Sequence, residues 1–241
     1  MIDSFHFDAY HKVAVNYNRD IETFPVIKRI IEKITGKDSV YLSPTDMGVN
    51  RVGFGIIDDE VVQEASRQEI IRRYFQTECD FKKGLIDEEA VNRMKLIMEE
   101  VGLQPEDRKV VMPAHNYAKA VQNSTNDPSA VIAIELPDEV ITTGRTSSLM
   151  NASAAVVLNA VKHLAHISDN IPLLSPLVLE RIQGMKASAS HSSIDTLSLN
   201  EVLIALSISA VTNPIAQVAY EKLAELDGAQ AHSTVMVNKN D

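Results

Sequence analysis

The spacing of apolar residues changes abruptly near residue 123, and this change constrains the fold more than any other feature of the chain. Before it, apolar residues recur at steps of three and four, which is typical of amphipathic helices. After the polar segment 123–129, two short runs rich in Val and Ile, 130–136 and 140–143, flank a Pro-Asp turn. This pattern predicts a β-hairpin. We therefore expect a helical layer followed by a part that contains strands.

Helix start and stop residues divide both halves into elements. Asp or Ser before an apolar run predicts an N-terminal cap, and Gly after the run predicts a helix end. The helices expected on this basis cover residues 18–35, 58–83, 87–101, 105–121, 152–165, 176–184, 198–211 and 214–228. We expect a loop over 186–196 and a last strand over 232–237.

The expected fold class is α/β, with α+β as the alternative. A mainly helical part, residues 1–123, precedes a small α/β part, residues 124–241, in which helices flank the hairpin. The two parts either form separate domains or pack as one unit.

The hairpin, a polar loop and an Ala-rich helix also resemble the start of the cytidine-deaminase-like fold. That fold uses a His or Cys and a Glu at the helix start to hold zinc and use it. This chain has Asn151, Ala152 and Ser153 at the equivalent place, and no P-C-x-x-C follows. The resemblance therefore implies the fold without its zinc site.

Composition limits the partners. The 241 residues include 23 Lys plus Arg and 33 Asp plus Glu, so the net charge is −10, which argues against binding to a phosphate backbone. The single cysteine, Cys79, cannot form an internal disulfide, which is typical of the cytoplasm. No apolar run is long enough to span a bilayer. We expect a cytoplasmic homo-oligomer, because several helices are more apolar than one small domain can bury, with no nucleic-acid or membrane partner.

The segment 43–59 crowds Gly, Pro, Asn and Asp between two helical patterns. Connections between helices are usually short, and longer ones are often functional. Asp46 and Asn50 offer oxygen atoms that can position a substrate hydroxyl or a hydrated magnesium ion, so both are candidate catalytic residues. The alternative is that the segment only joins two helices and that both side chains bond their own turns.

Gly144, Arg145, Thr146, Ser147 and Ser148 follow the hairpin and precede a helix. A loop that enters a helix N-terminus presents backbone N–H groups, and hydroxyls and a guanidinium beside them suit a phosphate or a carboxylate. These five residues are therefore the candidate site for a small anionic molecule. In the alternative, Ser147 and Ser148 only cap the helix and Arg145 faces water.

His232 begins the last predicted strand and is the third candidate catalytic residue, as an acid, a base or a ligand contact. The alternative is a hydrogen-bonded residue at a strand end. Ser233 points to the opposite face, because successive strand residues alternate, so these two side chains do not form a nucleophile–base pair. The chain contains neither H-E-x-x-H nor G-x-x-x-x-G-K-[ST], so we expect no metal site and can name no cofactor.

Six stretches together resemble one bacterial family, called domain of unknown function eighteen forty-six. They are VNYNRDIETFPVIKRI, YLSPTDMGVNRVGFGI, ASRQEIIRRY, AIELPDEVITTGRTSSL, LNEVLIALSISAVTNP and AHSTVMV. Members of the family are longer, and this chain resembles their C-terminal part. Some members carry the label ATP-dependent zinc peptidase, but the motifs for zinc hydrolysis and ATP binding are missing from this sequence.

The sequence leaves two functions open. The first is an enzyme, or the substrate half of one, that binds a small phosphorylated or carboxylated metabolite through Arg145 and the hydroxyls after it. Asp46, Asn50 and His232 would then be polar or catalytic partners. The alternative is a non-catalytic assembly module that partners a nucleotide-binding half absent from this chain. A catalytic half should bind a small ligand, whereas an assembly module should bind only protein.

Overall fold

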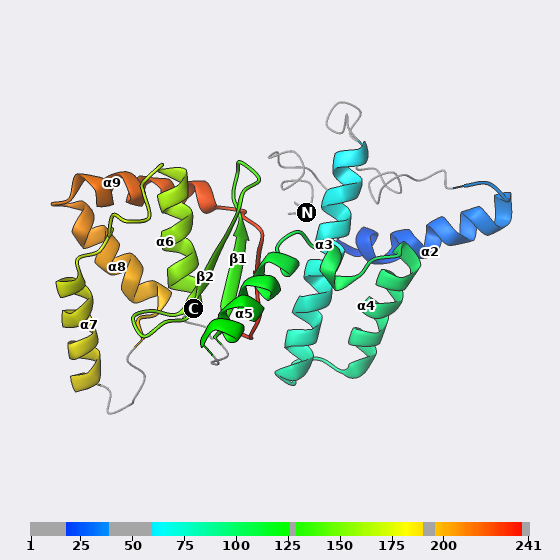
Figure 1. Cartoon of the computed structure of the whole chain (residues 1–241). Helices are drawn as coiled ribbons and strands as arrows, with labels where there is room; N and C mark the ends of the chain where they lie inside the picture. Colours follow the sequence, from blue (N-terminus) through cyan, green and yellow to red (C-terminus); the bar gives the residue numbers. More distant parts are fainter. Residues whose placement is uncertain (1–17, 39–58, 126–128, 190–195, 238–241) are drawn as a thin grey trace. The chain divides into compact units, whose positions relative to one another are not determined.

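The computed structural model describes residues 18–38, 59–125, 129–189 and 196–237. The chain divides into two compact units, Met1–Arg108 and Lys109–Asp241. Helices dominate both units and a small antiparallel sheet lies in the second (Figure 1), which confirms the mixed fold class. The likeness to the cytidine-deaminase-like fold stays a prediction. Among the described helices, none is both long enough and apolar enough to cross a membrane.

The described part of the first unit contains four elements: α2 (Asn18–Thr35), α3 (Asp59–Lys82), α4 (Glu88–Val101) and the 3₁₀ turn η2 (Pro105–Asp107). The predicted helix ends are confirmed, because Gly36, Gly84 and Gly102 follow the three α-helices with positive φ angles that favour glycine. Asp87 caps α4 as predicted, since its carboxylate accepts a hydrogen bond from the Ala90 N–H at 3.0 Å.

An apolar cluster joins α3 to α4. Its buried members are Ile70, Ile71, Met94, Ile97, Met98 and Leu103. Glu69 is also buried, and its carboxylate binds Arg72 and Arg73 at 2.6 and 2.9 Å. Burial alone would raise the pKa of Glu69, but hydrogen bonds from the two guanidinium groups outweigh it and hold the pKa below its ordinary value. The carboxylate therefore stays charged inside the first unit.

The helix predicted from Pro105 onward is interrupted, which corrects that prediction. After η2, Arg108 adopts an extended conformation with φ −74° and ψ 120°. Its buried guanidinium donates a hydrogen bond to the Gln68 carbonyl oxygen at 2.9 Å. The backbone leaves the helical path at this residue, and α5 (Val111–Thr125) begins only after it.

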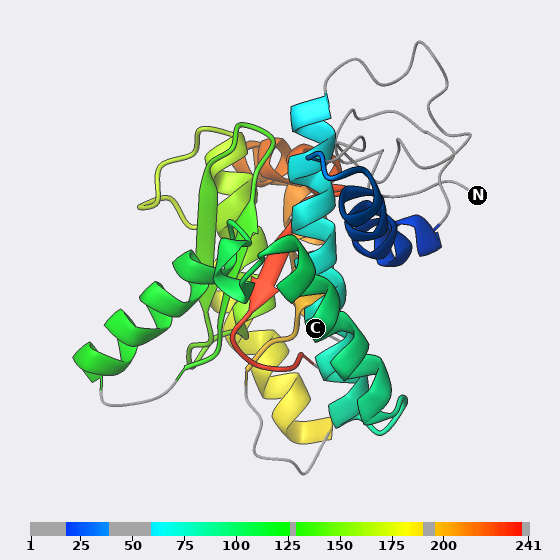
Figure 2. The same cartoon turned by 90° about the vertical axis from the view of Figure 1, so that its right-hand side faces the viewer.

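The second unit is built around three strands, β1 (Val131–Glu135), β2 (Ile141–Arg145) and β3 (Ala231–Ser233), in the order β2-β1-β3. Both pairings are antiparallel, so the predicted hairpin is confirmed. The strand expected at His232 is present (Figure 2, red) but shorter than predicted. It ends because the chain turns after Ser233, whose Oγ accepts a hydrogen bond from the Val235 N–H at 3.3 Å.

Helices cover both faces of this sheet (Figure 1). Val131 and Ala133 pack with Ala114 of α5 on one face. Ile132 packs with Val156 of α6 (Ala152–Leu164) on the other. Because α5 packs on the sheet, the second compact unit begins at Lys109, ahead of the predicted boundary at residue 124. Whether these units are separate domains stays a prediction.

The remaining elements are α7 (Pro176–Ala189), α8 (Leu199–Ala210), α9 (Pro214–Glu221) and the 3₁₀ turn η3 (Lys222–Leu226). α6, α8 and α9 share one core, which includes Val161, Leu206 and Ala216. The predicted helix end at Gly184 is wrong, because α7 continues to Ala189. The loop predicted over 186–196 is therefore wrong for residues 186–189, and its residues 190–195 lie outside the described ranges. Gly184 has no positive φ angle, and Ser188 Oγ donates to its carbonyl oxygen at 2.7 Å.

Candidate functional site

The predicted catalytic residues do not form one described site. Asp46 and Asn50 lie outside the described residues. His232 lies in β3, and its ring centre is 5.5 Å from that of His115 of α5, with an interplanar angle of 44°. His115 could not be recognised from the sequence, because no linear pattern links a residue of α5 to a strand near the other end of the second unit. The catalytic role of His232 stays a prediction. Over the described ranges, no group of three or more His, Cys, Asp or Glu side chains is arranged to hold a metal ion.

Gly144 and Arg145 are the last two residues of β2, so the strand predicted over 140–143 extends two residues further and the loop begins later than predicted. The anion site itself stays a prediction. Gly144 lies against α6, where a Cβ would come within 2.2 Å of the Val156 backbone nitrogen. Gly144 therefore permits the close approach of strand and helix. Arg145 pairs with Val131 of β1 and is half-buried. No carboxylate in the described part of the chain forms an ion pair with Arg145.

The hydroxyls of Thr146 and Ser147 already have backbone partners. Thr146 Oγ1 accepts a hydrogen bond from the Ala152 N–H, in the first turn of α6, at 3.1 Å. Ser147 Oγ accepts one from the Met150 N–H at 3.3 Å. Both N–H groups lie at the helix entry, where a bound anion would need them. The geometry therefore gives these two hydroxyls structural roles in the segment that leads into α6, whereas the cap of the helix is Asn151 and not Ser147 or Ser148.

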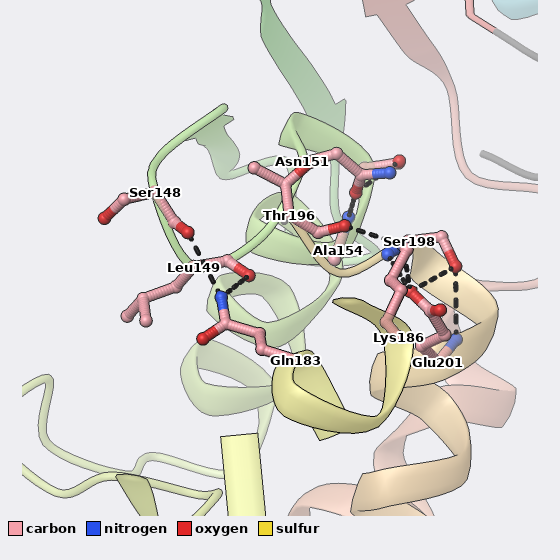
Figure 3. A network of polar contacts seen from close by, with 10 residues as sticks. Ser148, Leu149, Asn151, Ala154, Gln183, Lys186, Thr196, Ser198 and Glu201 are labelled. Atoms are coloured by element: carbon pink, nitrogen blue, oxygen red, sulfur yellow. Dashed lines mark hydrogen bonds and ion pairs between the residues drawn. The ribbon is translucent and has the colours of Figure 1, made fainter. Parts of the chain in front are cut away.

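Two helix N-termini lie side by side at this place (Figure 3). The segments that lead into α6 and α8 form a parallel bridge between Met150 and Leu197. Asn151 caps α6, and Ser198 forms a capping box with Glu201 at the start of α8, as the sequence predicts for α8. Paired N-termini concentrate positive partial charge. Here the chain's own side chains neutralise part of that charge.

α7 is tied to the loop before α6 by Gln183. Its Nε2 donates hydrogen bonds to the carbonyl oxygens of Ser148 and Leu149 at 3.2 and 3.3 Å (Figure 3). Ser148, the last predicted anion ligand, thus contributes its backbone carbonyl to a contact with α7. A carbonyl oxygen repels an anion, so this contact also favours a structural role for the loop.

Lys186 of α7 forms an ion pair with Glu201 of α8, and the distance between Nζ and Oε2 is 2.9 Å. Lys186 Nζ also donates to the Thr196 carbonyl oxygen at 2.8 Å, and the Ser198 N–H donates to Glu201 at 2.7 Å. Burial alone would raise the pKa of Glu201, but the hydrogen bonds from Lys186 and Ser198 hold it below its ordinary value. Glu201 therefore stays ionised and neutralises Lys186.

A groove of about 450 Å³ lies between α7 and α8. Its lining is apolar except for Arg181 and Glu201. The lining residues are Leu177, Val178, Arg181, Ile182, Met185, Glu201, Ile204, Ala205 and Ile208. The large side chains at its rim are strongly exposed, including Leu177 at 61% and Met185 at 66%. This groove is an open, apolar concave surface of the second unit.

α8 is strongly apolar but buries only one face. Val202 and Leu206 are buried, whereas Ile204, Ile208 and Val211 are exposed by 60%, 66% and 83%. The described part of the second unit therefore leaves an apolar row uncovered, which runs along α8 and ends at Val211, directly after the helix.

Two family profiles cover the chain. The one described as "Domain of unknown function DUF1846, N-terminal" matches residues 1–102, and the one described as "Domain of unknown function DUF1846, C-terminal" matches residues 106–241. The chain belongs to the DUF1846 family. The predicted resemblance is confirmed, and it extends into the family's N-terminal domain rather than its C-terminal part alone.

Similar proteins of this family occur in clostridia. A "UPF0371 protein" of Clostridium botulinum (strain Langeland) is 63% identical over 243 residues, which cover 100% of this chain and 48% of that protein. UPF0371 proteins of Clostridioides difficile (strain 630) and Clostridium tetani (strain Massachusetts) are each 60% identical to this chain. Each match covers 100% of this chain and 48% of the relative. The chain thus spans about half the length of these relatives, whose printed names assign no activity.

Proposed function

We propose that this chain is a non-catalytic assembly module, in which the surface formed by α7 and α8 docks a second copy of the chain. The observation that carries the proposal is the exposed apolar row of α8, formed by Ile204, Ile208 and Val211, beside an apolar groove. A two-fold dimer presents the same surface twice. The apolar row and the apolar groove lie on one surface, so two copies of that surface can pack against each other.

The groove carries little charge compared with the whole chain. Two copies that each carry −10 repel one another at long range. The groove is lined by a single positive residue, Arg181, and a single negative one, Glu201. Because Lys186 neutralises Glu201, the lining keeps one net positive charge, that of Arg181. Association therefore brings apolar side chains together without burying an unpaired carboxylate of the lining.

The test replaces a residue in the apolar row. Truncation or disruption of a central interface residue costs about 2 kcal/mol or more, which weakens the dimer roughly thirtyfold. We expect Ile204→Glu to shift the chain towards the monomer in sedimentation velocity. The matched control is Leu96→Glu on α4, because Leu96 is also 60% exposed. The proposal fails when the Ile204 variant associates as strongly as the control.

A second candidate is the binding of a small phosphorylated or carboxylated molecule through Arg145. It is favoured by one observation, the half-buried guanidinium for which no described carboxylate supplies an ion pair. A ligand at a hundred times its dissociation constant adds about 2.7 kcal/mol. We expect an anionic ligand to raise the melting temperature of the wild-type chain and not that of Arg145→Ala. An equal shift in both proteins would contradict this site.

A further inference from the structure

We infer that the groove between α7 and α8 binds a small amphipathic carboxylate, whose apolar body lies against the groove walls and whose carboxylate binds Arg181. The inference goes beyond the proposed self-association and does not depend on it. It starts from the chemistry of the lining, which is apolar except for Arg181 and Glu201.

The groove has the size of a small-ligand site. Its volume of about 450 Å³ lies within the range of roughly 300–1,000 Å³ that is typical of such sites, which are mostly apolar and carry a few polar groups that orient the ligand. Leu177 and Met185 of α7 and Ile204 and Ile208 of α8 line it, and all four side chains are strongly exposed. An apolar ligand in the groove removes part of this apolar surface from water, which is favourable.

The charge of the lining selects the head group. Glu201 is neutralised by Lys186, whereas Arg181 forms no ion pair with a carboxylate of the described residues. Leu177 and Met185 lie four residues before and after Arg181, so the three side chains share one face of α7. A guanidinium binds a carboxylate through two parallel hydrogen bonds. The groove therefore places one unneutralised cation beside apolar walls, which complements an amphipathic monoanion.

Three ligands of equal chain length separate the contributions of the cation and of the walls. In isothermal titration calorimetry of the dilute wild-type chain, we expect octanoate to bind more tightly than octanol by roughly two- to fivefold, the effect of an exposed ion pair. Octylamine should bind more weakly than octanol, because Arg181 repels its ammonium group. Each further methylene, tested with nonanoate and decanoate, should tighten binding by up to about fourfold.

Two substitutions at exposed positions locate the ligand. Arg181→Gln should weaken octanoate binding to the level of octanol and leave octanol binding unchanged, whereas Ile208→Ser should weaken the binding of both. The matched controls are Lys119→Gln on α5 and Leu96→Ser on α4, an exposed cation and an exposed apolar residue outside the groove lining. Neither control should change the binding of octanoate or octanol.

Two results would overturn the inference. One is a wild-type chain that binds neither octanoate nor decanoate. The other is octanoate binding that Arg181→Gln leaves unchanged, or that octylamine matches in affinity, because the cation would then not select the head group. Sedimentation velocity without ligand tests the self-association separately, so the failure of either proposal is recognised independently of the other.

Discussion

Gly144 lies in β2 directly against α6, where a Cβ would come within 2.2 Å of the Val156 nitrogen. Overpacking of this kind typically costs about 1–3 kcal/mol. Because the obstructing atoms belong to the backbone, we expect Gly144→Ala to lower the free energy of unfolding by at least that amount in chemical denaturation. Gly184 in α7 is the matched control, since no atom would meet its Cβ within 4 Å. Gly184→Ala should instead stabilise the chain by about 0.5–1 kcal/mol. Equal effects at both positions would contradict the close contact at Gly144.

Glu201 gives the chain a predictable response to acid. Its pKa lies below the ordinary value of 4.5 in the folded state, so between the two pKa values the unfolded chain binds more protons than the folded one. The stability that Glu201 contributes is therefore present above the unfolded pKa and is lost as pH falls through the folded pKa. We expect denaturation at pH 7 and near pH 4 to show a smaller loss of stability in Glu201→Gln than in wild type. Lys186→Met should reduce this loss as well, because Lys186 is the ionic partner. An unchanged loss in both variants would contradict the assignment.

At the residue level, the sequence identifies the polar groups but not their partners. The sequence alone does not tell whether the hydroxyls of Thr146 and Ser147 bind a ligand or a backbone N–H. In the folded chain the Thr146 hydroxyl accepts a hydrogen bond from the Ala152 N–H, a contact that depends on how the loop folds back towards α6. His115 could not be predicted as a neighbour of His232, since their contact depends on how α5 packs on the sheet.

At the scale of elements, α7 depends on a small number of contacts. Its side-chain links to the rest of the unit include Gln183 to the loop before α6, and Lys186 to Thr196 and Glu201. Helices with few buried contacts exchange their amide hydrogens through local opening. We expect Lys186→Met to speed hydrogen exchange over α7 while leaving exchange over α6 unchanged. The matched control is Lys222→Met, which removes a lysine–glutamate pair in η3. Equal acceleration by both variants would show that the Lys186 contacts do not hold α7.

Most element positions follow from local chemistry, which is why they can be predicted. Asp87 and Ser198 cap helices, and a Pro-Asp turn joins the hairpin, because these residues bond their own neighbours. The errors have two origins. Arg108 lies outside the helical path where its guanidinium contacts the distant Gln68. β3 instead stops at a local turn, in which Ser233 Oγ accepts a hydrogen bond from the Val235 N–H.

At the scale of the whole molecule, the sequence predicts an excess of apolar helix surface but not its location. α8 alternates in burial around its circumference, and only the packed structure separates the buried residue Leu206 from the exposed residue Ile208. The groove beside that row depends on the angle between the axes of α7 and α8. No local sequence pattern determines this angle. The sequence thus predicts a homo-oligomer, and the surface of α7 and α8 is our proposal for where its subunits meet.

Self-association through α8 is the central claim, and a dilution series of the unmodified chain in sedimentation velocity tests it most directly. We predict a species of twice the chain mass of 26.6 kDa at high concentration, which dissociates to a single chain on dilution. Ile204→Glu should move this transition to higher concentration, whereas Leu96→Glu should not. A single-chain mass at every concentration, in wild type and in both variants, would contradict the claim.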